Sequence, residues 1–350
     1  MYGMKQKVRG LVIMRNRFWK WMLPALLLAV CLMSACGSPA NAPEDKEIVR
    51  LDVILDWYPN AIHTFLYEAV EQGYFAQEGL EVRLITPAES VDAVNFVASG
   101  KAQIGLSYPV DILQAYASGM PVLSIGAISQ KALDCMCALA SNETITDDMT
   151  SLKGKTIGYA GTQVSKAVVD TVTSGAGLAA SDFTLLNVGF DLVTSLTTGN
   201  ADLVVGTFLN DEIVTMQNMG YELQVFSEQE YGVPELYGLV FCVNREDYEA
   251  RPEVYEGFLR ACQRGFADMK ADEDAALELI MSSMNTADNP LDEVQQRESY
   301  EILIPLMETE EAPFLSMDGQ VWQKIMEWMV DTGQMNKEVD VANVISNILP

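Results

Sequence analysis

The sequence has few basic residues and a single histidine, His63, and these shortages exclude several classes of function. Its 350 residues include 22 Lys and Arg against 49 Asp and Glu, which gives a formal net charge of −27. Six of the basic residues lie among the first 35, where there is no acid, so the remaining 315 residues carry −33. A body this acidic is repelled by polyphosphate and by anionic membrane surfaces. We therefore expect no nucleic-acid partner.

Motifs for catalysis and metal binding are also missing. The chain has no Walker loop, no G-x-S-x-G turn, no Cys-x-x-Cys pair and no Ser-His-acid spacing, and His63 has no evident nucleophile beside it in the sequence. With one histidine and no cysteine pair, a metal site has little support. The sequence therefore predicts a binding protein rather than an enzyme, without metal or cofactor.

The chain has no apolar run long enough to cross a bilayer, which needs about 20 residues. Its longest, 22–33, follows Arg15, Arg17 and Lys20 and ends in Met33-Ser34-Ala35-Cys36, which resembles a bacterial lipobox. We predict a signal peptide over 1–35, lipidation of Cys36 as a membrane anchor and a flexible tether over 36–47. An ordinary signal peptide with an incidental cysteine is the alternative, and translation starts at Met1 or Met14.

The other cysteines are predicted to be buried free thiols. Cys135 and Cys137 alternate along a strand-like run, too far apart for an easy disulfide. Cys242 lies in another apolar run, and Cys262 has helical spacing with neighbouring apolar residues. A disulfide from Cys242 to Cys135 or Cys137 is the alternative outside the cell.

Strand-like and helix-like segments alternate from residue 48 to about 230, which predicts an α/β fold with largely parallel sheets. The predicted strands are 48–57, 81–85, 103–106, 121–128, 156–159, 183–188, 202–205 and 222–226, and the helices between them are 62–73, 91–98, 110–118, 164–174, 191–198 and 210–219. Segments 99–104 and 198–203 resemble each other, which indicates two similar halves. Helices alone follow, at 252–269, 273–284, 293–308, 319–332 and 340–349. The predicted lobes are 48–140 with 238–350, and 141–237, joined by crossing segments as a hinged clamp.

Ligands of open parallel sheets bind outside the carboxyl ends of the strands. The candidate binding residues that follow the predicted strands are Trp57, Tyr58, Asn60, His63, Tyr108, Asp111, Tyr159, Thr162, Phe208 and Asn210. Only Lys131 and Lys166 are basic nearby, so the lining suits a flat neutral or cationic ring rather than an anion. Each candidate has an ordinary alternative: Trp57 and Tyr58 as half-buried strand residues, His63 as an exposed residue of a helix's first turn.

Several segments resemble ABC-transporter solute-binding proteins of the thiamine-pyrimidine-precursor (NMT1/THI5-like) family. They are Leu55-Asp56-Trp57-Tyr58-Pro59-Asn60 followed by His63, and the segments 72–75, 78–82, 98–102, 152–159 and 230–234. The likeness covers about 48–335. It implies a two-lobed type II periplasmic-binding fold that captures formylaminopyrimidine or hydroxymethylpyrimidine, adds Tyr237 to the candidate site, and implies a monomer that delivers its ligand to an ABC permease and its ATPase. Relatives bind riboflavin-like rings, sulfonates or nitrate.

Other relatives are pyrimidine synthases that consume their own histidine and bound pyridoxal phosphate. Asp111 stands at the position of that histidine, Lys101 matches their cofactor lysine, and segment 237–242 lacks their cysteine cluster. Gly238 stands where pyrimidine binders have an acid, a departure that concerns the ligand rather than the fold. A sensory ectodomain that serves a membrane receptor is a further alternative, which the sequence leaves open.

Overall fold

The computed structural model describes residues 48–88 and 92–349. The predicted signal peptide, the lipidation site Cys36 and the whole of the predicted tether lie outside the described residues. In the part described, no helix is both long and apolar enough to cross a membrane.

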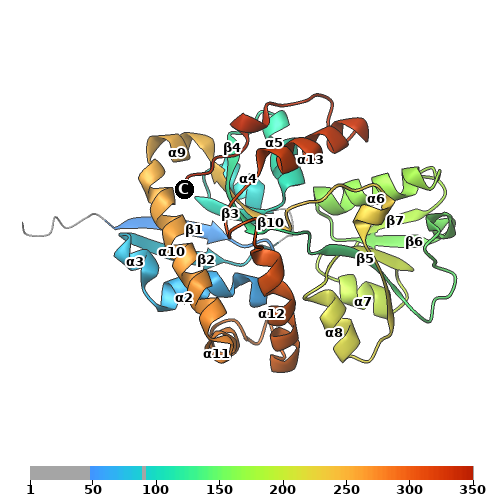
Figure 1. The fold of residues 1–350 in the computed structure, drawn as a ribbon. Helices are drawn as coiled ribbons and strands as arrows, with labels where there is room; N and C mark the ends of the chain where they lie inside the picture. Colours follow the sequence, from blue (N-terminus) through green and yellow to red (C-terminus); the bar gives the residue numbers. More distant parts are fainter. Residues whose placement is uncertain (1–47, 89–91, 350) are drawn as a thin grey trace, which may run out of the picture. The chain divides into compact units, whose positions relative to one another are not determined.

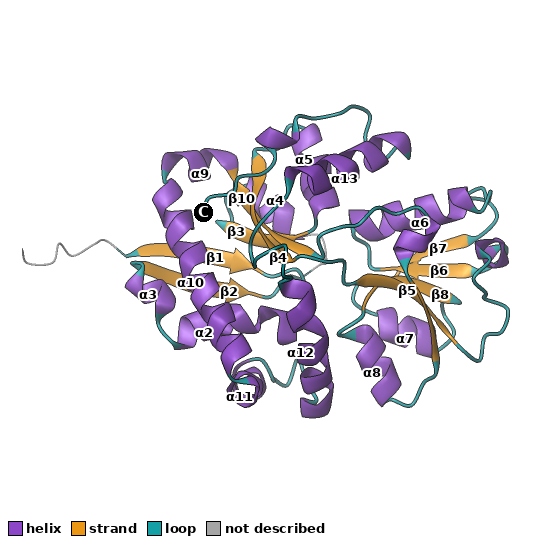
Figure 2. Cartoon of the chain, in the orientation of Figure 1, coloured by secondary structure: helices purple, strands orange, loops and turns teal. Residues whose placement is uncertain are grey.

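Two β-sheets with the same strand order form the framework (Figures 1 and 2). The first sheet runs β2-β1-β3-β10-β4 and the second β7-β6-β8-β5-β9. The strands of the first are β1 (Val49–Ile54), β2 (Leu80–Ile85), β3 (Ile104–Ser107), β4 (Val122–Ser129) and β10 (Leu239–Asn244). Those of the second are β5 (Asp134–Leu139), β6 (Thr156–Tyr159), β7 (Thr184–Asn187), β8 (Leu203–Phe208) and β9 (Leu223–Phe226).

The match between the sheets extends to strand direction. In each sheet three adjacent strands pair in parallel, and a strand that the other half of the chain contributes, β10 or β5, pairs antiparallel with both of its neighbours. The two similar halves predicted from the sequence are therefore confirmed. The carboxyl ends of the parallel strands β1, β3, β6 and β8 carry the loops that form the site described below.

Helices cover both sheets and extend the first lobe. They are α2 (Thr64–Glu71), α3 (Tyr74–Gln77), α4 (Asp92–Ala98), α5 (Pro109–Ala117), α6 (Gln163–Gly175), α7 (Leu192–Thr197), α8 (Glu212–Asn218), α9 (Arg245–Ala250), α10 (Pro252–Ala271), α11 (Glu273–Ser283), α12 (Glu293–Met307) and α13 (Gly319–Asp331). Short 3₁₀ turns are η1 (Ala61–His63), η2 (Met149–Leu152), η3 (Glu228–Tyr231) and η4 (Val341–Asn343). As expected, α10 and α11 pack on α2, and α13 packs on α5, whereas α12 also contacts α8.

The helix predicted over 340–349 is wrong. Asp340 caps only the short turn η4, after which Ile345 forms a parallel bridge with Ser124 of β4. The backbone of Ser124 donates to Val344 O at 2.8 Å and accepts from Ser346 N at 2.9 Å. The apolar spacing that indicated a helix belongs instead to an extended segment that covers the free edge of β4, where unpaired backbone groups need partners.

The chain leaves the first sheet earlier than predicted. β5 begins at Asp134 and pairs with β8 and β9, so the crossing lies between Ser129 and Asp134 rather than at residue 140. The chain returns to the first sheet at β10, which begins at Leu239 and pairs with β3. Cys135 and Cys137 lie in β5, Cys242 in β10 and Cys262 in α10, and all four are buried free thiols. The alternative disulfide from Cys242 is therefore not formed.

Helices α10 and α2 approach closely at Gly265. A Cβ there would lie 2.1 Å from the carbonyl oxygen of Phe65 and 3.0 Å from the amide nitrogen of Ala69, both backbone atoms. Because neither can move alone, Gly265→Ala should force the two helices apart.

We expect Gly265→Ala to lower the free energy of unfolding by about 1–3 kcal/mol, the usual cost of overpacking. The control is Gly257→Ala in the same helix, where the neighbours are side-chain atoms of Glu78 at 3.3 Å. There the gain in helix propensity, about 1 kcal/mol, should offset the contact. Urea unfolding measures both, and equal stabilities would contradict this account of the helix contact.

Candidate functional site

The loops that follow the parallel strands of both sheets enclose a small hollow, called here the inner hollow. It is lined by Trp57, Asn60, Tyr108, Asp134, Ala160, Thr162, Gly206, Phe208, Asp211 and Glu212. Its volume is about 10 Å³, which is room for roughly one water molecule. The lobes are therefore closed onto each other at this point.

Two larger hollows adjoin it. The side hollow, of about 190 Å³, shares Tyr108 with the inner hollow and is lined on its polar side by Asp56, Asn95, Ser107, Asp111, Gln114 and Gln163. The outer hollow, of about 640 Å³, shares Trp57, Asn60, Asp211 and Glu212 with it and adds Tyr58, Phe190 and Gln295. A flat molecule of drug-like size has room in the outer hollow, but not in the inner one without movement of the lobes.

Aromatic rings from the two lobes meet around these hollows. Trp57 packs edge-on against Phe190 with ring centroids 4.3 Å apart, and Tyr58 lies 4.9 Å from the same ring. Tyr108 faces Phe208 edge-on at 6.4 Å. Tyr108 and Phe208 follow corresponding strands of the two sheets, so the internal repeat places one aromatic ring on each side. Such rings offer faces on which a planar ligand can stack.

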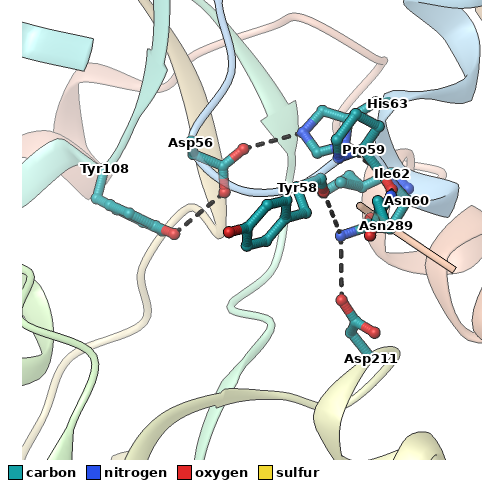
Figure 3. Close-up of polar contacts among 9 residues, drawn as sticks. All are labelled: Asp56, Tyr58, Pro59, Asn60, Ile62, His63, Tyr108, Asp211 and Asn289. Atoms are coloured by element: carbon teal, nitrogen blue, oxygen red, sulfur yellow. Dashed lines mark hydrogen bonds and ion pairs between the residues drawn. The ribbon is translucent and has the colours of Figure 1, made fainter. Parts of the chain in front are cut away.

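The loop after β1 is fixed by a capping box at η1. The Asn60 side chain accepts from Ile62 N at 3.1 Å, while the Asn60 backbone N–H donates to Nδ1 of His63 at 3.2 Å. Because Nδ1 accepts this bond, the His63 proton is placed on Nε2, which donates to Asp56 Oδ1 at 3.0 Å. The other Asp56 oxygen accepts from the Tyr108 hydroxyl at 3.3 Å (Figure 3).

The same asparagine connects the two lobes. Asn60 Nδ2 donates to Asp211 Oδ2 at 3.0 Å, and Gln295 Nε2 of α12 donates to Asp211 Oδ1 at 2.8 Å (Figure 3 shows the first of these bonds). Gln295 in turn accepts from Gln296, whose own side-chain oxygen accepts from Ala61 N. Asp211, at the start of α8, is thus held on both oxygens by amides of the first lobe. We call Asn60, Asp211 and Gln295 the latch.

Carboxyl groups dominate the electrostatics of the hollows. Burial raises the pKa of Asp111 to about 7, although hydrogen bonds from Ser107 and from the backbone at the start of α6 oppose the rise. Burial and the facing Asp56 and Asp111 raise the pKa of Asp134, and burial with the neighbouring Asp211 raises that of Glu212. In the part of the chain that the structure describes, no Lys or Arg lines any of the three hollows.

Seven of the predicted site residues line the hollows, and four do not. Those that line them are Trp57, Tyr58, Asn60, Tyr108, Asp111, Thr162 and Phe208. His63 is fully buried behind the loop, where both ring nitrogens are hydrogen-bonded. Asn210 Nδ2 donates to Ser299 Oγ, and the Tyr237 hydroxyl accepts from Asp318 N. Tyr159 lies within β6 and lines none of the three hollows.

Several lining residues were not among the predicted site residues, and those that matter most are Asp56, Asp134, Phe190, Asp211, Glu212 and Gln295. Asp134 begins β5, and since β5 runs antiparallel its first residue lies at the carboxyl edge of the parallel strands. Phe190 follows β7 and could have been found by the rule used for the other strands. Gln295 comes from α12, far away in sequence, and no local signal points to it.

The sequence profile of the NMT1/THI5-like family matches residues 60–276. A formylaminopyrimidine-binding protein of Halalkalibacterium halodurans is 34% identical over 324 residues, which cover 93% of this chain and 97% of that protein. The chain belongs to the NMT1/THI5-like family. Other relatives bear the names of pyrimidine synthases: one from Aspergillus parasiticus, a 4-amino-5-hydroxymethyl-2-methylpyrimidine phosphate synthase, is 29% identical over 239 residues, covering 65% of this chain and 69% of that protein.

Solved structures establish the fold of this NMT1/THI5-like protein. The alkanesulfonate-binding protein SsuA of Xanthomonas axonopodis superimposes with a TM-score of 0.67 at 14% identity, covering 86% of this chain and 99% of that one. The periplasmic aliphatic sulphonate-binding protein SsuA of Escherichia coli gives 0.66 at 13%, with 85% and 97% covered. The chain therefore has the α/β fold of the periplasmic binding proteins, and at these identities the likeness concerns the fold alone.

Lys101, which matches the cofactor lysine of the family's synthases, lies away from the hollows. Gly238 differs from the acid that pyrimidine binders have at its position. Lys101 is exposed before the amino end of β3, opposite to the edge that carries the site, with its amine 5.2 Å from the Phe96 ring centroid. At Gly238 a Cβ would lie 2.7 Å from the Lys131 carbonyl oxygen. An acid at that position would not fit this backbone. Among the described residues there is also no group of three or more side chains suited to holding a metal.

The latch predicts a specific effect on closure. Gln295→Ala removes one of the two donors to the Asp211 carboxylate, and a hydrogen bond to a charged group contributes about 1.5–3 kcal/mol. We expect the lobes to separate and the radius of gyration in small-angle scattering to increase.

Asn218→Ala is the matched control. It also removes a bond between α8 and α12, from Asn218 Nδ2 to Glu298 Oε2 at 2.8 Å, but that bond is exposed and should contribute under about 1 kcal/mol. An unchanged radius of gyration in Gln295→Ala, or an equal change in both variants, would contradict the role given to the latch.

Proposed function

We propose that the protein is the extracytoplasmic solute-binding component of an ABC importer, and that it captures a flat aminopyrimidine of the thiamine-precursor type between its lobes. In this proposal the first lobe consists of residues 48–133 and 238–350, and the second of residues 134–237. A lipid on Cys36 would hold a monomer at the membrane, beside the permease and ATPase that receive the ligand. We propose no catalytic step.

The observation that carries the ligand class is the lining of the hollows. Aromatic rings from both lobes surround them, and their ionisable groups are carboxyls and the two tyrosines Tyr58 and Tyr108, without a lysine or arginine among the described residues. Recognition of sulfonate, nitrate or phosphate calls for cationic or N–H-rich donors. The likeness to sulfonate-binding structures is therefore not matched by a sulfonate-type lining.

An aminopyrimidine fits this lining on both its faces and its edge. Its ring faces suit Trp57, Tyr58 and Tyr108, and its amino group donates to carboxyl oxygens. A 4-aminopyrimidine also presents a ring-nitrogen acceptor beside that donor. A protonated carboxyl such as Asp111, whose pKa is raised to about 7, presents the complementary donor and acceptor. The formylaminopyrimidine-binding relative supports the same ligand class.

The small inner hollow supports a clamp that opens to admit its ligand. A pyrimidine ring does not fit in about 10 Å³, so Trp57 and Asn60 must move away from Phe208 and Asp211 before it enters. These residues belong to different lobes, and such movement is the hinge closure seen in two-lobed binding proteins.

A synthase is the alternative that the relatives' names bring in. Against it stand Asp111 in place of the consumed histidine and the position of Lys101, away from the hollows. Formation of the pyrimidine from pyridoxal phosphate and iron, with loss on Lys101→Ala, would establish the enzyme instead.

A thermal-shift screen tests the ligand class first. We expect 4-amino-5-hydroxymethyl-2-methylpyrimidine or its formylamino relative to raise the melting temperature, since a ligand at 100 times its Kd stabilises the fold by about 2.7 kcal/mol. Alkanesulfonates, nitrate and riboflavin should leave it unchanged. A shift with an anion or a flavin and none with the pyrimidines would discard the thiamine-type assignment while keeping the clamp.

Substitution of the aromatic rings tests the site. Trp57→Ala and Tyr58→Ala should abolish detectable binding by calorimetry, because each loses its buried area and a further 0.5–1.5 kcal/mol or so of stacking. The unfolding transition should be preserved, since Tyr58 is exposed and Trp57 is half-buried. Tyr116→Ala, half-buried on α5 under Arg245, is the control. Unchanged affinity in both site variants would refute the placement of the ligand.

A further inference from the structure

The inner and side hollows together are lined by five carboxyl groups that surround one tyrosine. Asp134, Asp211 and Glu212 line the inner hollow, Asp56 and Asp111 line the side hollow, and Tyr108 lines both. They come from separate elements: the loop after β1, helix α5, the first residue of β5 and the start of α8. Their collection in one place therefore results from the closed arrangement of the two lobes.

Hydrogen bonds from the protein satisfy only some of the oxygens of these five carboxyl groups. Asp56 accepts from His63 and Tyr108, and Asp211 accepts from Asn60 and Gln295, so each of these carboxylates has a donor on either oxygen. Asp111 Oδ1, by contrast, is enclosed and has no hydrogen-bond partner among the described residues. Its free oxygen needs a donor that the protein does not supply there.

A sixth carboxyl lies behind Asp134. Glu228, in η3, is 0% exposed, and neither of its oxygens has a hydrogen-bond partner among the described residues. An isolated carboxylate in such a place would cost several kcal/mol, so Glu228 is protonated. Burial and the facing Asp134 raise its pKa. The region behind the hollows thus already excludes further negative charge.

Among the described residues, no lysine or arginine lines the inner or the side hollow. The titratable groups that face Asp134 and Asp111 are Asp56 from the loop after β1, Tyr108 from the end of β3, Glu212 from α8, Glu228 from η3, Cys135 from β5 and Cys242 from β10. His63 lies near Asp56 and Asp211, and both of its ring nitrogens are already engaged, Nδ1 with the Asn60 N–H and Nε2 with Asp56.

A planar ligand would make the charge problem more severe. It leaves no room for water beside Asp111, Asp134 and Glu212, and like charges repel more strongly as the local dielectric falls. Above neutral pH, where these carboxyls would otherwise be ionised, the occupied cleft must gain positive charge. A proton held between a carboxyl oxygen and a basic nitrogen of the ligand supplies that charge.

We infer that the cleft binds its ligand together with a proton from solvent, and that it selects nitrogen heterocycles basic enough to share that proton with Asp111 or Asp134. The inference rests on the proposed function, because it concerns how the same site recognises an aminopyrimidine. The complex then contains one more proton than the separate protein and ligand, and no bond other than those to this proton changes.

The sign of the pH dependence follows from linkage. Because the complex binds more protons than its free components, the affinity falls as pH rises, by up to tenfold per pH unit for one proton. The window begins near pH 7, where Asp111 titrates in the free protein. Below that pH the free cleft already holds the proton and the affinity levels off.

The test is isothermal titration calorimetry of the purified protein with 4-amino-5-hydroxymethyl-2-methylpyrimidine at pH 8, in phosphate and in Tris. The observed enthalpy differs between buffers in proportion to the protons exchanged. We expect uptake of about 0.5–1 proton, and a Kd that rises about tenfold or more between pH 7.5 and pH 9. The analogue with an oxo group in place of the amino group should bind at least about 30-fold more weakly, because it lacks the basic site.

Variants distinguish the contribution of the cleft carboxyls to proton uptake from that of acidic residues elsewhere on the surface. Asp134→Asn and Asp111→Asn should each reduce proton uptake, whereas Glu327→Gln, exposed on α13 and bonded to Gln323, should leave it unchanged. If either cleft variant does not fold, the pH series and buffer comparison on the unmodified protein still decide the question.

Two failures can be told apart. If the pyrimidine binds with the same Kd from pH 6 to pH 9 and without proton exchange, the inference is overturned and the proposed function stands. If the pyrimidine does not bind at any of these pH values, the proposed function itself fails. Equal affinity for the oxo analogue would also overturn the selection of basic rings.

Discussion

The hydrogen bond from the Asn60 backbone to Nδ1 of His63 determines the arrangement of the site. It is the reciprocal half of a capping box, so it fixes the loop after β1, and it also fixes the tautomer of the only histidine. With its proton on Nε2, His63 orients Asp56, which receives the Tyr108 hydroxyl. The asparagine that forms the box extends its amide to Asp211 in the other lobe. One local motif therefore couples the ring that faces the ligand to the contact that closes the lobes.

The repeated topology explains why such a contact can form. In each sheet the parallel strands end at the same edge, and the strand from the other half of the chain, β5 or β10, starts there because it runs antiparallel. The first crossing segment, 130–133, is therefore short and leads directly into the site. Asp134, the first residue of β5, is at once the end of one crossing segment and a wall of the inner hollow. Movement at the crossing consequently changes the surroundings of Asp134.

Local patterns predicted most of this architecture. Apolar periodicity and glycine turns indicate the strands, and the rule that ligands bind at carboxyl ends points to Trp57, Tyr108 and Phe208 from the sequence alone. The rule failed for Asp134, because strand direction is a property of the sheet and not of the segment. It offered nothing for Gln295, which reaches the site only through the packing of α12. The end of the chain, 340–349, was mispredicted because apolar residues that cover a sheet edge can have helical spacing.

The latch favours closure of the lobes, whereas repulsion among the carboxyl groups of the cleft opposes it. In our proposal the ligand removes this opposition. Closure forms the bonds of Asp211 to Asn60 and Gln295, but it also brings Asp134, Glu212 and Asp111 toward one another and removes their water. Without a ligand, the closed state therefore gains hydrogen bonds and pays for desolvated like charges. A ring that supplies amino donors and a shared proton would remove the repulsion between the carboxylates and leave the hydrogen bonds of the latch in place. In the proposed carrier role, this differential stabilisation of the closed state would distinguish the loaded form from the empty one. The acidity of the cleft thus ties ligand selection to closure.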